Sequence, residues 1–211
     1  MNKFLVVFDV DSTLIKDEVI ELLADCAGVR AEVAEVTERA MRGDLDFADS
    51  LRERVSKLAG LPESVISETY ERIQLTDGVR ELIDAIHERG GLAGAVSGGF
   101  NQLLEPLAAR LGLDHWRANQ LEISGGKLTG QVSGAIIDRE AKTKALIEWA
   151  NQHGIAQTRT MAVGDGANDL GMMSQAGLGV AFNAKPLVRA QANLVIGASS
   201  LAELIPLLPR A

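Results

Sequence analysis

The sequence is poor in cysteine, in histidine and in basic clusters. Cys26 is its one cysteine, which excludes an internal disulfide and a zinc cluster built on cysteines. Lysine and arginine number 21 against 29 aspartates and glutamates, so the formal net charge is -8 and the pI is near 5.0. Nucleic-acid surfaces carry clustered basic residues that neutralise phosphates. We therefore expect no nucleic-acid partner.

Long hydrophobic segments are also missing. The first apolar run, Phe4 to Phe8, is too short for the core of a signal peptide, and nothing approaches the roughly 20 apolar residues of a membrane span. We therefore expect a cytoplasmic protein without membrane contact. The 211 residues are 46% hydrophobic and 24% charged, which is ordinary for a globular protein with a sizeable core.

The order of sequence patterns predicts an α/β fold. Apolar runs of strand length lie at 3–9, 92–97 and 159–164, with shorter ones near 178–181 and 194–196. Helical patterns lie at 78–89, 100–111, 140–153, from 169, and at 201–208. We expect a Rossmann-like parallel sheet with helices on both faces. Within 116–135, Gly125 and Gly126 separate two strand-like runs and predict a hairpin appended to the core.

The pattern between the first two strands is nearly all helical, which predicts an insertion. We assign residues 1–14 and 76–211 to an α/β core and residues 15–75 to a small inserted helical domain, a cap on that core. The chain contains no internal repeat and no low-complexity linker. The boundaries between core and insertion therefore rest only on the change in hydrophobic periodicity along the sequence.

Three predicted strands end in polar loops. Asp9 and Asp11 follow the first strand, Ser97 and Gly98 the second, and residues 164–169 the third. Ligands of open α/β sheets bind at the carboxyl ends of strands. Two carboxylates two residues apart point the same way and repel each other unless a cation or a shared proton compensates, which predicts a divalent metal or a nucleophile and acid pair. Taken by itself, the five-residue segment is interpreted first as an Asx-rich turn that ends a strand.

Lys142 lies on the apolar side of its predicted helix. It shares the spacing i, i+3, i+4, i+7 with Ala145, Leu146 and Trp149, whereas Lys144 falls on another face. A lysine that points inward requires an anion. The alternative is that its stem packs and its amine reaches solvent.

Two charged residues of the predicted cap occupy positions that should be apolar. Arg54 continues the stripe that contains Leu51, and Glu18 shares a helical face with Ile15 and Leu22. Each charge therefore faces a ligand or the interior. The alternative is that Glu18 and Arg54 form a structural ion pair.

The ordered set of motifs, Asp9 to Thr13, Ser97 to Gly99, Lys142 and Gly164 to Asp169, resembles the haloacid dehalogenase-type phosphohydrolases, and among them most closely the phosphoserine phosphatases. The resemblance spans the chain from the first strand to at least Asp169. It implies hydrolysis of O-phospho-L-serine to L-serine and phosphate, the last step of serine biosynthesis.

Two alternatives stay open at this point. The first is a phosphatase or phosphotransferase of the same fold that acts on another small phosphomonoester. The second is non-enzymatic, a receiver-like phospho-accepting signalling domain, which the sixty-residue helical insertion disfavours. We expect a monomer or a homodimer. Some bacterial relatives carry an additional N-terminal region, and because the catalytic strand begins at residue 3, we expect no regulation through such a region.

The resemblance implies the roles of the acidic residues. Asp9 is the nucleophile that forms an aspartyl-phosphate, and Asp11 protonates the leaving group and then activates water. Mg²⁺ is the implied cofactor, with Asp9, the backbone carbonyl of Asp11, and Asp165 as ligands. Hard oxygen ligands, with the histidines placed elsewhere, favour magnesium over zinc.

The resemblance also implies the substrate contacts. Ser97, Gly98 and Lys142 hold the phosphate, although Ser97 is alternatively only a helix N-cap. Glu18 takes the substrate ammonium and Arg54 its carboxylate. The remaining implied residues are Asn168, which reaches the substrate or its phosphate, Asp169 and Thr13, which support the site, and Phe47, which forms an apolar wall.

Overall fold

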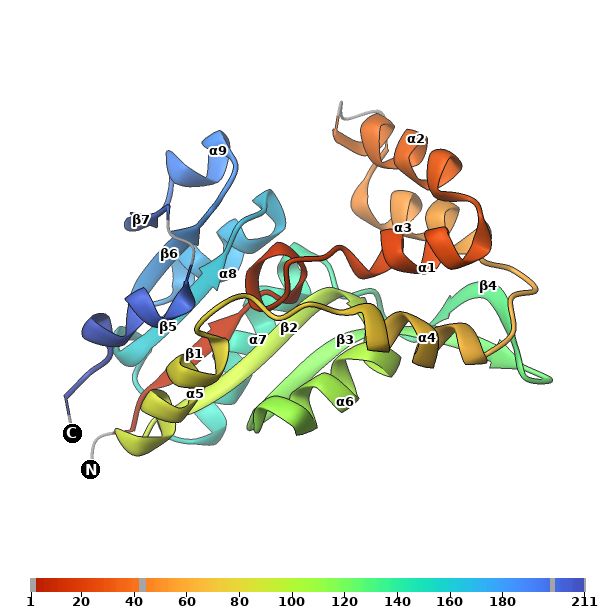
Figure 1. Cartoon of the computed structure of the whole chain (residues 1–211). Helices are drawn as coiled ribbons and strands as arrows, with labels where there is room; N and C mark the ends of the chain where they lie inside the picture. Colours follow the sequence, from red (N-terminus) through yellow and green to blue (C-terminus); the bar gives the residue numbers. More distant parts are fainter. Residues whose placement is uncertain (1–2, 42–44, 198–199, 211) are drawn as a thin grey trace.

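A seven-stranded sheet forms the centre of the protein (Figure 1). The computed structural model describes residues 3–41, 45–197 and 200–210. The strand order is β4-β3-β2-β1-β5-β6-β7, and every neighbouring pair is parallel except β3 with β4. The strands are β1 (Leu5–Phe8), β2 (Leu92–Phe100), β3 (His115–Ser124), β4 (Lys127–Ser133), β5 (Thr160–Gly164), β6 (Leu178–Phe182) and β7 (Leu194–Ile196). The predicted α/β class is confirmed.

The central strand β1 is buried on both faces, as its continuous apolar sequence predicts. It lies between β2 and β5, which come later in the chain and pair with it on opposite sides. Its carboxyl end is therefore a point at which the chain connections diverge, and such points form ligand crevices in open α/β sheets. This topology places the carboxyl ends of β2 and β5 on either side of Asp9.

Helices cover both faces of the sheet. Val6 and Phe8 pack into one apolar cluster with α5 (Val79–Glu88), α6 (Asn101–Leu111) and the 3₁₀ helix η4 (Leu201–Leu207). Leu5 and Val7 pack on the other face with α7 (Arg139–Gln152) and α8 (Leu170–Gln175). The alternation of side chains along β1 thus divides the core into two layers.

Within the described residues, a short π-helix, η1 (Val10–Leu14), and four α-helices lie between β1 and α5. The α-helices are α1 (Val19–Ala27), α2 (Arg30–Met41), α3 (Phe47–Ser56) and α4 (Ser64–Arg72), and Figure 1 shows α1, α2 and α3 grouped to one side of the sheet. The two segments that connect these inserted helices to the core run side by side. The Lys16 amide donates to the Gln74 carbonyl at 2.8 Å, and the Thr76 amide donates to the Leu14 carbonyl at 3.0 Å.

The predicted division into core and cap stays a hypothesis. Its two boundaries, 14/15 and 75/76, fall in the two hydrogen-bonded segments that connect the inserted helices to the core. Residues 1–2, 42–44, 198–199 and 211 of the predicted ranges lie outside the described residues.

The predicted hairpin is confirmed as β3 and β4, joined at Gly125 and Gly126. It contacts the segment between α3 and α4. The Gly60 amide donates to the Leu128 carbonyl at 2.8 Å, and the Leu128 amide donates to the Leu61 carbonyl at 2.9 Å. The hairpin therefore ties the inserted helices to the sheet.

Three local features differ from the sequence prediction. Strand β2 continues to Phe100 rather than ending at 97, and its pairing with β3 shifts register between Val96 and Phe100. The last helix is a 3₁₀ helix that contains Pro206 rather than an α-helix. A short helix, α9 (Pro186–Arg189), was not predicted. Within the described ranges, no helix combines the length and hydropathy that crossing a membrane requires.

Candidate active site

A cleft of ≈ 330 Å³ lies at the carboxyl ends of β1, β2 and β5. It brings together nine of the residues that the sequence predicts for the site: Asp9, Asp11, Glu18, Phe47, Arg54, Ser97, Gly98, Asp165 and Asn168. The other three, Thr13, Lys142 and Asp169, are fully buried and do not line the cleft. The inserted helices and the sheet both contribute to its walls.

Lys142 links two carboxylates beneath the cleft. Its Nζ donates to Asp9 Oδ1 at 2.5 Å and to Asp169 Oδ1 at 2.8 Å, and its side chain is fully buried. Burial lowers the pKa of the lysine, but the carboxylates of Asp169 and Asp9 outweigh burial and raise it. Lys142 therefore stays charged, and the alternative in which its amine reaches solvent is wrong.

Helix α7 aims Lys142 at the sheet. Asp138 caps the helix by accepting the Ala141 amide at 2.9 Å, which places Lys142 in the first turn. Ala145 and Trp149 follow on the same buried face, whereas Lys144 is exposed. The predicted helical stripe is confirmed at every one of these positions.

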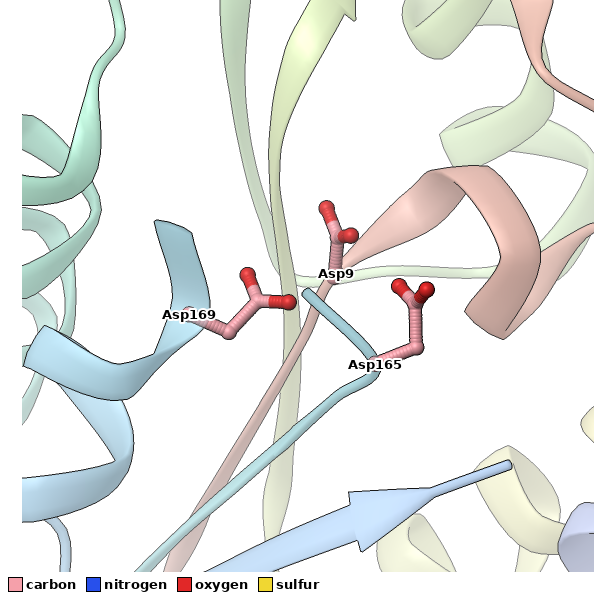
Figure 2. A group of neighbouring side chains, drawn as sticks. All are labelled: Asp9, Asp165 and Asp169. Carbon is pink, nitrogen blue, oxygen red and sulfur yellow. The ribbon is translucent and has the colours of Figure 1, made fainter. Parts of the chain in front are cut away.

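Three carboxylates converge around the end of β1. Figure 2 shows Asp165 and Asp169 on either side of Asp9, and one oxygen of each lies within 4.8 Å of the others. Burial and the neighbouring Asp169 raise the pKa of Asp9 to about 7, although Lys142 opposes the shift. Burial and Asp169 likewise raise the pKa of Asp165 to about 6.

This acidic group fits a divalent cation. Raised pKa values at Asp9 and Asp165 mean that the one lysine does not compensate the three negative charges. All donors are hard oxygens, as magnesium and calcium prefer. The carboxylate of Asp11 does not belong to this group.

Asp11 has a carboxyl group suited to proton transfer. Burial, Glu18 and Asp9 raise its pKa well above the usual value, and the Val19 amide donates a hydrogen bond to it. Its Oδ1 is buried and, within the described residues, lacks a hydrogen-bond partner. A carboxyl group with a raised pKa can hold a proton near neutral pH and give it to a substrate.

The carboxyl-terminal end of β2, which contains Ser97 to Phe100, presents backbone groups to the cleft. Ser97 Oγ accepts the Gly99 amide at 2.7 Å, and the residue that caps α6 is Phe100, so the N-cap interpretation of Ser97 is wrong. A Cβ atom on Gly98 would lie 2.9 Å from Cζ of Phe47. The absence of a side chain at Gly98 therefore allows α3 to approach the carboxyl end of β2 closely.

The two charged residues of the inserted helices reach the same cleft. Arg54 lies on α3, and its Nε donates to the Ser50 carbonyl at 3.2 Å. Burial lowers its pKa, while Glu18 and Asp11 oppose the shift. Among the described residues, no ion pair joins Arg54 to Glu18, so the structural-pair alternative is not what the structure shows.

The helical argument for Glu18 is wrong in detail. Helix α1 begins at Val19, and Glu18 precedes it in an extended conformation, so Glu18 does not share a helical face with Ile15. Glu18 is exposed and accepts the Ser12 hydroxyl at 2.7 Å. Glu18 reaches the cleft because the segment that connects β1 to α1 passes beside the cleft. Helical periodicity does not encode the path of that segment.

The sequence prediction missed three residues around the cleft. Ser50 and Lys185 line it. Asn119 is buried behind it, donates from Nδ2 to the Gly98 carbonyl at 2.8 Å and accepts the Ile137 amide at 2.8 Å. Ser50 alone carried a sequence signal, a polar residue one turn before Arg54 on the buried side of a predicted helix.

Comparisons with known proteins agree with this geometry. A family described as haloacid dehalogenase-like hydrolase matches residues 6–174. A phosphoserine phosphatase of Streptococcus thermophilus is 50% identical over 98% of this chain and 96% of its own length. One of Streptomyces coelicolor is 52% identical over 97% of this chain, which spans 50% of that longer protein.

Solved structures show the same likeness. A substrate-bound phosphoserine phosphatase superimposes with a TM-score of 0.94 at 41% identity and covers 99% of this chain and 100% of its own. A phospho-aspartyl intermediate analogue of a phosphoserine phosphatase superimposes with a TM-score of 0.93 at the same identity and coverage. The chain therefore belongs to the haloacid dehalogenase-like hydrolase family, among its phosphoserine phosphatases.

Proposed function

We propose that this protein hydrolyses O-phospho-L-serine to L-serine and inorganic phosphate, through an aspartyl-phosphate on Asp9. One observation carries the proposal: a single cleft joins the paired carboxylates Asp9 and Asp11 to the separated charges Glu18 and Arg54. The first pair suits phosphoryl transfer, and the second suits an amino acid. Relatives that are named phosphoserine phosphatases support the same substrate.

Asp9 is the proposed nucleophile. Lys142 holds its carboxylate in one orientation and favours its ionised form, which is the form that attacks phosphorus. The Asp9 oxygen bonds to phosphorus as the bond to the serine oxygen breaks. Asp11 gives its proton to the departing alkoxide and then takes a proton from the water that attacks the aspartyl-phosphate.

The carboxyl end of β2 and Lys142 are the proposed phosphate contacts. Ser97 and the Gly98 amide line the cleft beside Asp9, and Asn168 lines it from the loop after β5. Charge-assisted hydrogen bonds from such groups stabilise the negative oxygens of a transferring phosphoryl group. Asp169 supports this arrangement by accepting Lys142 and the Gly166 amide, and the buried Thr13 is proposed to support the turn after Asp9.

We propose that Asp9, Asp165 and the backbone carbonyl of Asp11 hold Mg²⁺. When bound, the ion supplies positive charge that neutralises the phosphate oxygens. Asp169 belongs to the acidic group, but both of its oxygens accept hydrogen bonds, Oδ1 from Lys142 and Oδ2 from the Gly166 amide, whereas Lys142 bonds only to Oδ1 of Asp9. Asp9 and Asp165 are therefore the proposed direct ligands.

The two charges from the inserted helices explain the choice of an amino-acid substrate. Arg54 presents a guanidinium with no ion-pair partner among the described residues, and a carboxylate would satisfy it bidentately. Glu18 offers a carboxylate to the ammonium. Phe47 lies over Gly98 as an apolar wall between these charges and the phosphate.

The runner-up is a phosphatase or phosphotransferase that acts on another small phosphomonoester with the same core chemistry. Family membership and the inserted helices contradict the receiver-like alternative. We place the reaction at the last step of serine biosynthesis and propose a cytoplasmic enzyme. A monomer or homodimer stays a prediction.

Phosphate release from three substrates tests the proposal. Phosphoserine should be hydrolysed far better than phosphoethanolamine, which lacks the carboxylate, or 3-phosphoglycerate, which lacks the ammonium, because each leaves a cleft charge without its partner. Arg54→Ala should raise KM for phosphoserine about tenfold or more and leave an aryl phosphate nearly unaffected. Arg52→Ala is the matched control, since Arg52 lies on the same helix but is exposed and pairs with Asp49.

Equal losses of activity on phosphoserine, phosphoethanolamine and 3-phosphoglycerate after Arg54→Ala would contradict phosphoserine as the substrate. The phosphatase chemistry would still stand. Undetectable phosphate release from every substrate by the unmodified protein would contradict both.

A further inference from the structure

The cleft contains a cation that the proposed chemistry does not use. Lys185 lines the cleft together with Asp9 and Asp165, and its side chain is exposed. Among the described residues, it joins no ion pair. We propose that Lys185 is an entry-site residue that attracts the phosphate group of the substrate into the cleft and retains inorganic phosphate before release, an inference that rests on the proposed phosphatase function.

The backbone holds Lys185 beside the acidic group. The residue follows β6 and caps α9, where Pro186 occupies the first helical position. Its amide donates to the Asp165 carbonyl at 3.2 Å. The loop that carries Lys185 is therefore attached to the loop that carries Asp165, and the lysine stem begins next to the proposed phosphate site.

The charge of the cleft creates a need for such a cation. Among the residues that the structure describes, four carboxylates line it, those of Asp9, Asp11, Glu18 and Asp165, against two cations, Arg54 and Lys185. The whole chain carries a net charge of -8. A phosphomonoester brings roughly 1.5 to 2 further negative charges at neutral pH. Even with a divalent ion present, an approaching phosphate therefore meets like charge unless cations at the entrance offset it.

Lys142 and Arg54 do not serve this purpose. Lys142 is fully buried and its amine is bonded to Asp9 and Asp169, so it acts only after the substrate has arrived. Arg54 lies on the inserted helices and is proposed to bind the carboxylate. Lys185 comes from the sheet side of the cleft and is free to meet the phosphate.

The field of Lys185 reaches the site. Its charge lowers the pKa of Asp165 and so opposes the upward shift that burial and Asp169 cause. The same field acts on any anion in that part of the cleft. Because the lysine is exposed, its effect should be screened by salt, with a Debye length of about 8 Å at physiological ionic strength.

An entrance cation has a distinctive kinetic signature. It acts on substrate capture and product retention but not on bond breaking at Asp9. Lys185→Gln should therefore lower kcat/KM for phosphoserine about three- to tenfold at low salt, change kcat less than about twofold, and weaken inhibition by inorganic phosphate to a similar extent. The loss of kcat/KM should shrink as salt rises.

Two further variants make the experiment specific. Lys185→Arg keeps the charge and should restore most of kcat/KM and its dependence on salt. Lys144→Gln removes the same charge from an exposed position on α7, outside the cleft lining, and is the matched control for net charge. Steady-state kinetics of the four proteins at two salt concentrations, with circular dichroism to verify folding, complete the set.

Each outcome decides the inference. Identical kinetics for Lys185→Gln and Lys144→Gln would overturn it, and so would a fall in kcat with unchanged KM, which would place Lys185 in the chemical step. Absence of phosphate release from any phosphomonoester by the unmodified protein would instead overturn the proposed function. The two failures are therefore distinguishable.

Discussion

Asp9 shows how burial and charge act together on a single side chain. Burial and the nearby Asp169 raise its pKa, whereas the bonded amine of Lys142 lowers it, and the balance lies near neutral pH. A carboxylate whose pKa lies near neutral pH is oriented by its hydrogen bond to the lysine but is not locked into a permanent ion pair. The same residue can thus be oriented by Lys142 and still attack phosphorus.

Asp9→Asn tests the nucleophile. The change removes one ionisable oxygen and almost no volume, so the fold should persist while phosphate release falls about a thousandfold or more. Circular dichroism and a phosphate-release assay make the measurement, with the exposed Asp84→Asn as the control for an amide substitution. Substantial turnover by Asp9→Asn would move the nucleophile elsewhere.

Asp11→Asn tests the proton donor. An amide can neither give nor take the required proton, so turnover should fall by about a hundred- to ten-thousandfold, the usual contribution of general acid and base catalysis. The loss should be smaller for an aryl phosphate, whose leaving group needs less protonation. A uniform loss across leaving groups would count against the acid role of Asp11.

Asp165 predicts a dependence of stability on pH. Its folded pKa of about 6 lies above the ordinary value of 3.8, so its charge costs no folding free energy below pH 3.8 and costs the full amount above about pH 6. In chelator, Asp165→Asn should therefore be more stable than the unmodified protein at pH 7.5, by on the order of 1 kcal/mol after allowance for partial solvent exposure. The difference should vanish as pH falls from about 6 to 4.

Denaturant unfolding of both proteins across this pH range is the measurement, again beside Asp84→Asn. A stability difference that stays constant from pH 4 to 7.5 would show that the charge of Asp165 is not its origin.

Among the elements, the β3–β4 hairpin has a role beyond the sheet. It hydrogen-bonds to the segment between α3 and α4, so it helps to position α3 beside the carboxyl end of β2. Helix α3 carries Phe47 and Arg54. The position of the residues that we propose to select the substrate therefore depends on a hairpin that lies far from them in the sequence.

Two glycines of the hairpin region separate packing from backbone strain. Gly130 has φ +81° and a Cβ there would lie 2.8 Å from the Ala59 Cβ, whereas Gly134 has φ +77° with nothing within 4 Å. Gly134→Ala should cost about 1 kcal/mol from the left-handed backbone alone. Gly130→Ala should cost a further 1 to 3 kcal/mol, roughly, because the hairpin must move away from the inserted helices.

Thermal or urea unfolding of both variants gives the difference, and KM for phosphoserine reports whether α3 has moved. Equal destabilisation by the two substitutions would show that the hairpin does not constrain the inserted helices.

At the scale of the whole molecule, the cleft depends on three parts of the chain that fold together. Strand ends supply the carboxylates, α7 supplies Lys142, and the inserted helices supply Arg54. The uncompensated negative charge where they meet is a cost of assembly that a cation relieves. Metal binding should therefore affect stability as well as activity.

Removal of metal tests this coupling. Chelator should abolish phosphate release, magnesium should restore it, and calcium should restore it poorly because its looser coordination holds Asp9 less well for attack. Magnesium at about 100 times its Kd should also stabilise the fold by about 2.7 kcal/mol, visible as a rise in Tm. Asp165→Asn should remove most of that rise, and full activity in chelator would refute the magnesium proposal.

Sequence patterns predicted the strand ends and helix faces because each is encoded within a short window. The run Phe4 to Phe8 predicts a buried strand, and the spacing of Lys142, Ala145 and Trp149 predicts an inward lysine. Glu18 was assigned to the correct cleft for the wrong reason, since it precedes its helix. The sequence allows two roles for Ser97, and the structure excludes the N-cap role because Phe100 caps α6.

The sequence by itself determined the α/β class, the polar strand ends and the ordered motifs, because hydrophobic periodicity and turn residues are local properties of the chain. Only the tertiary structure decided which distant residues meet. Lys142 bonds to Asp9 across 133 positions, Asn119 holds Gly98 from a neighbouring strand, and Lys185 joins the cleft through a loop without any motif. Such contacts depend on strand order and on the packing of helices against the sheet, which no local window of sequence contains.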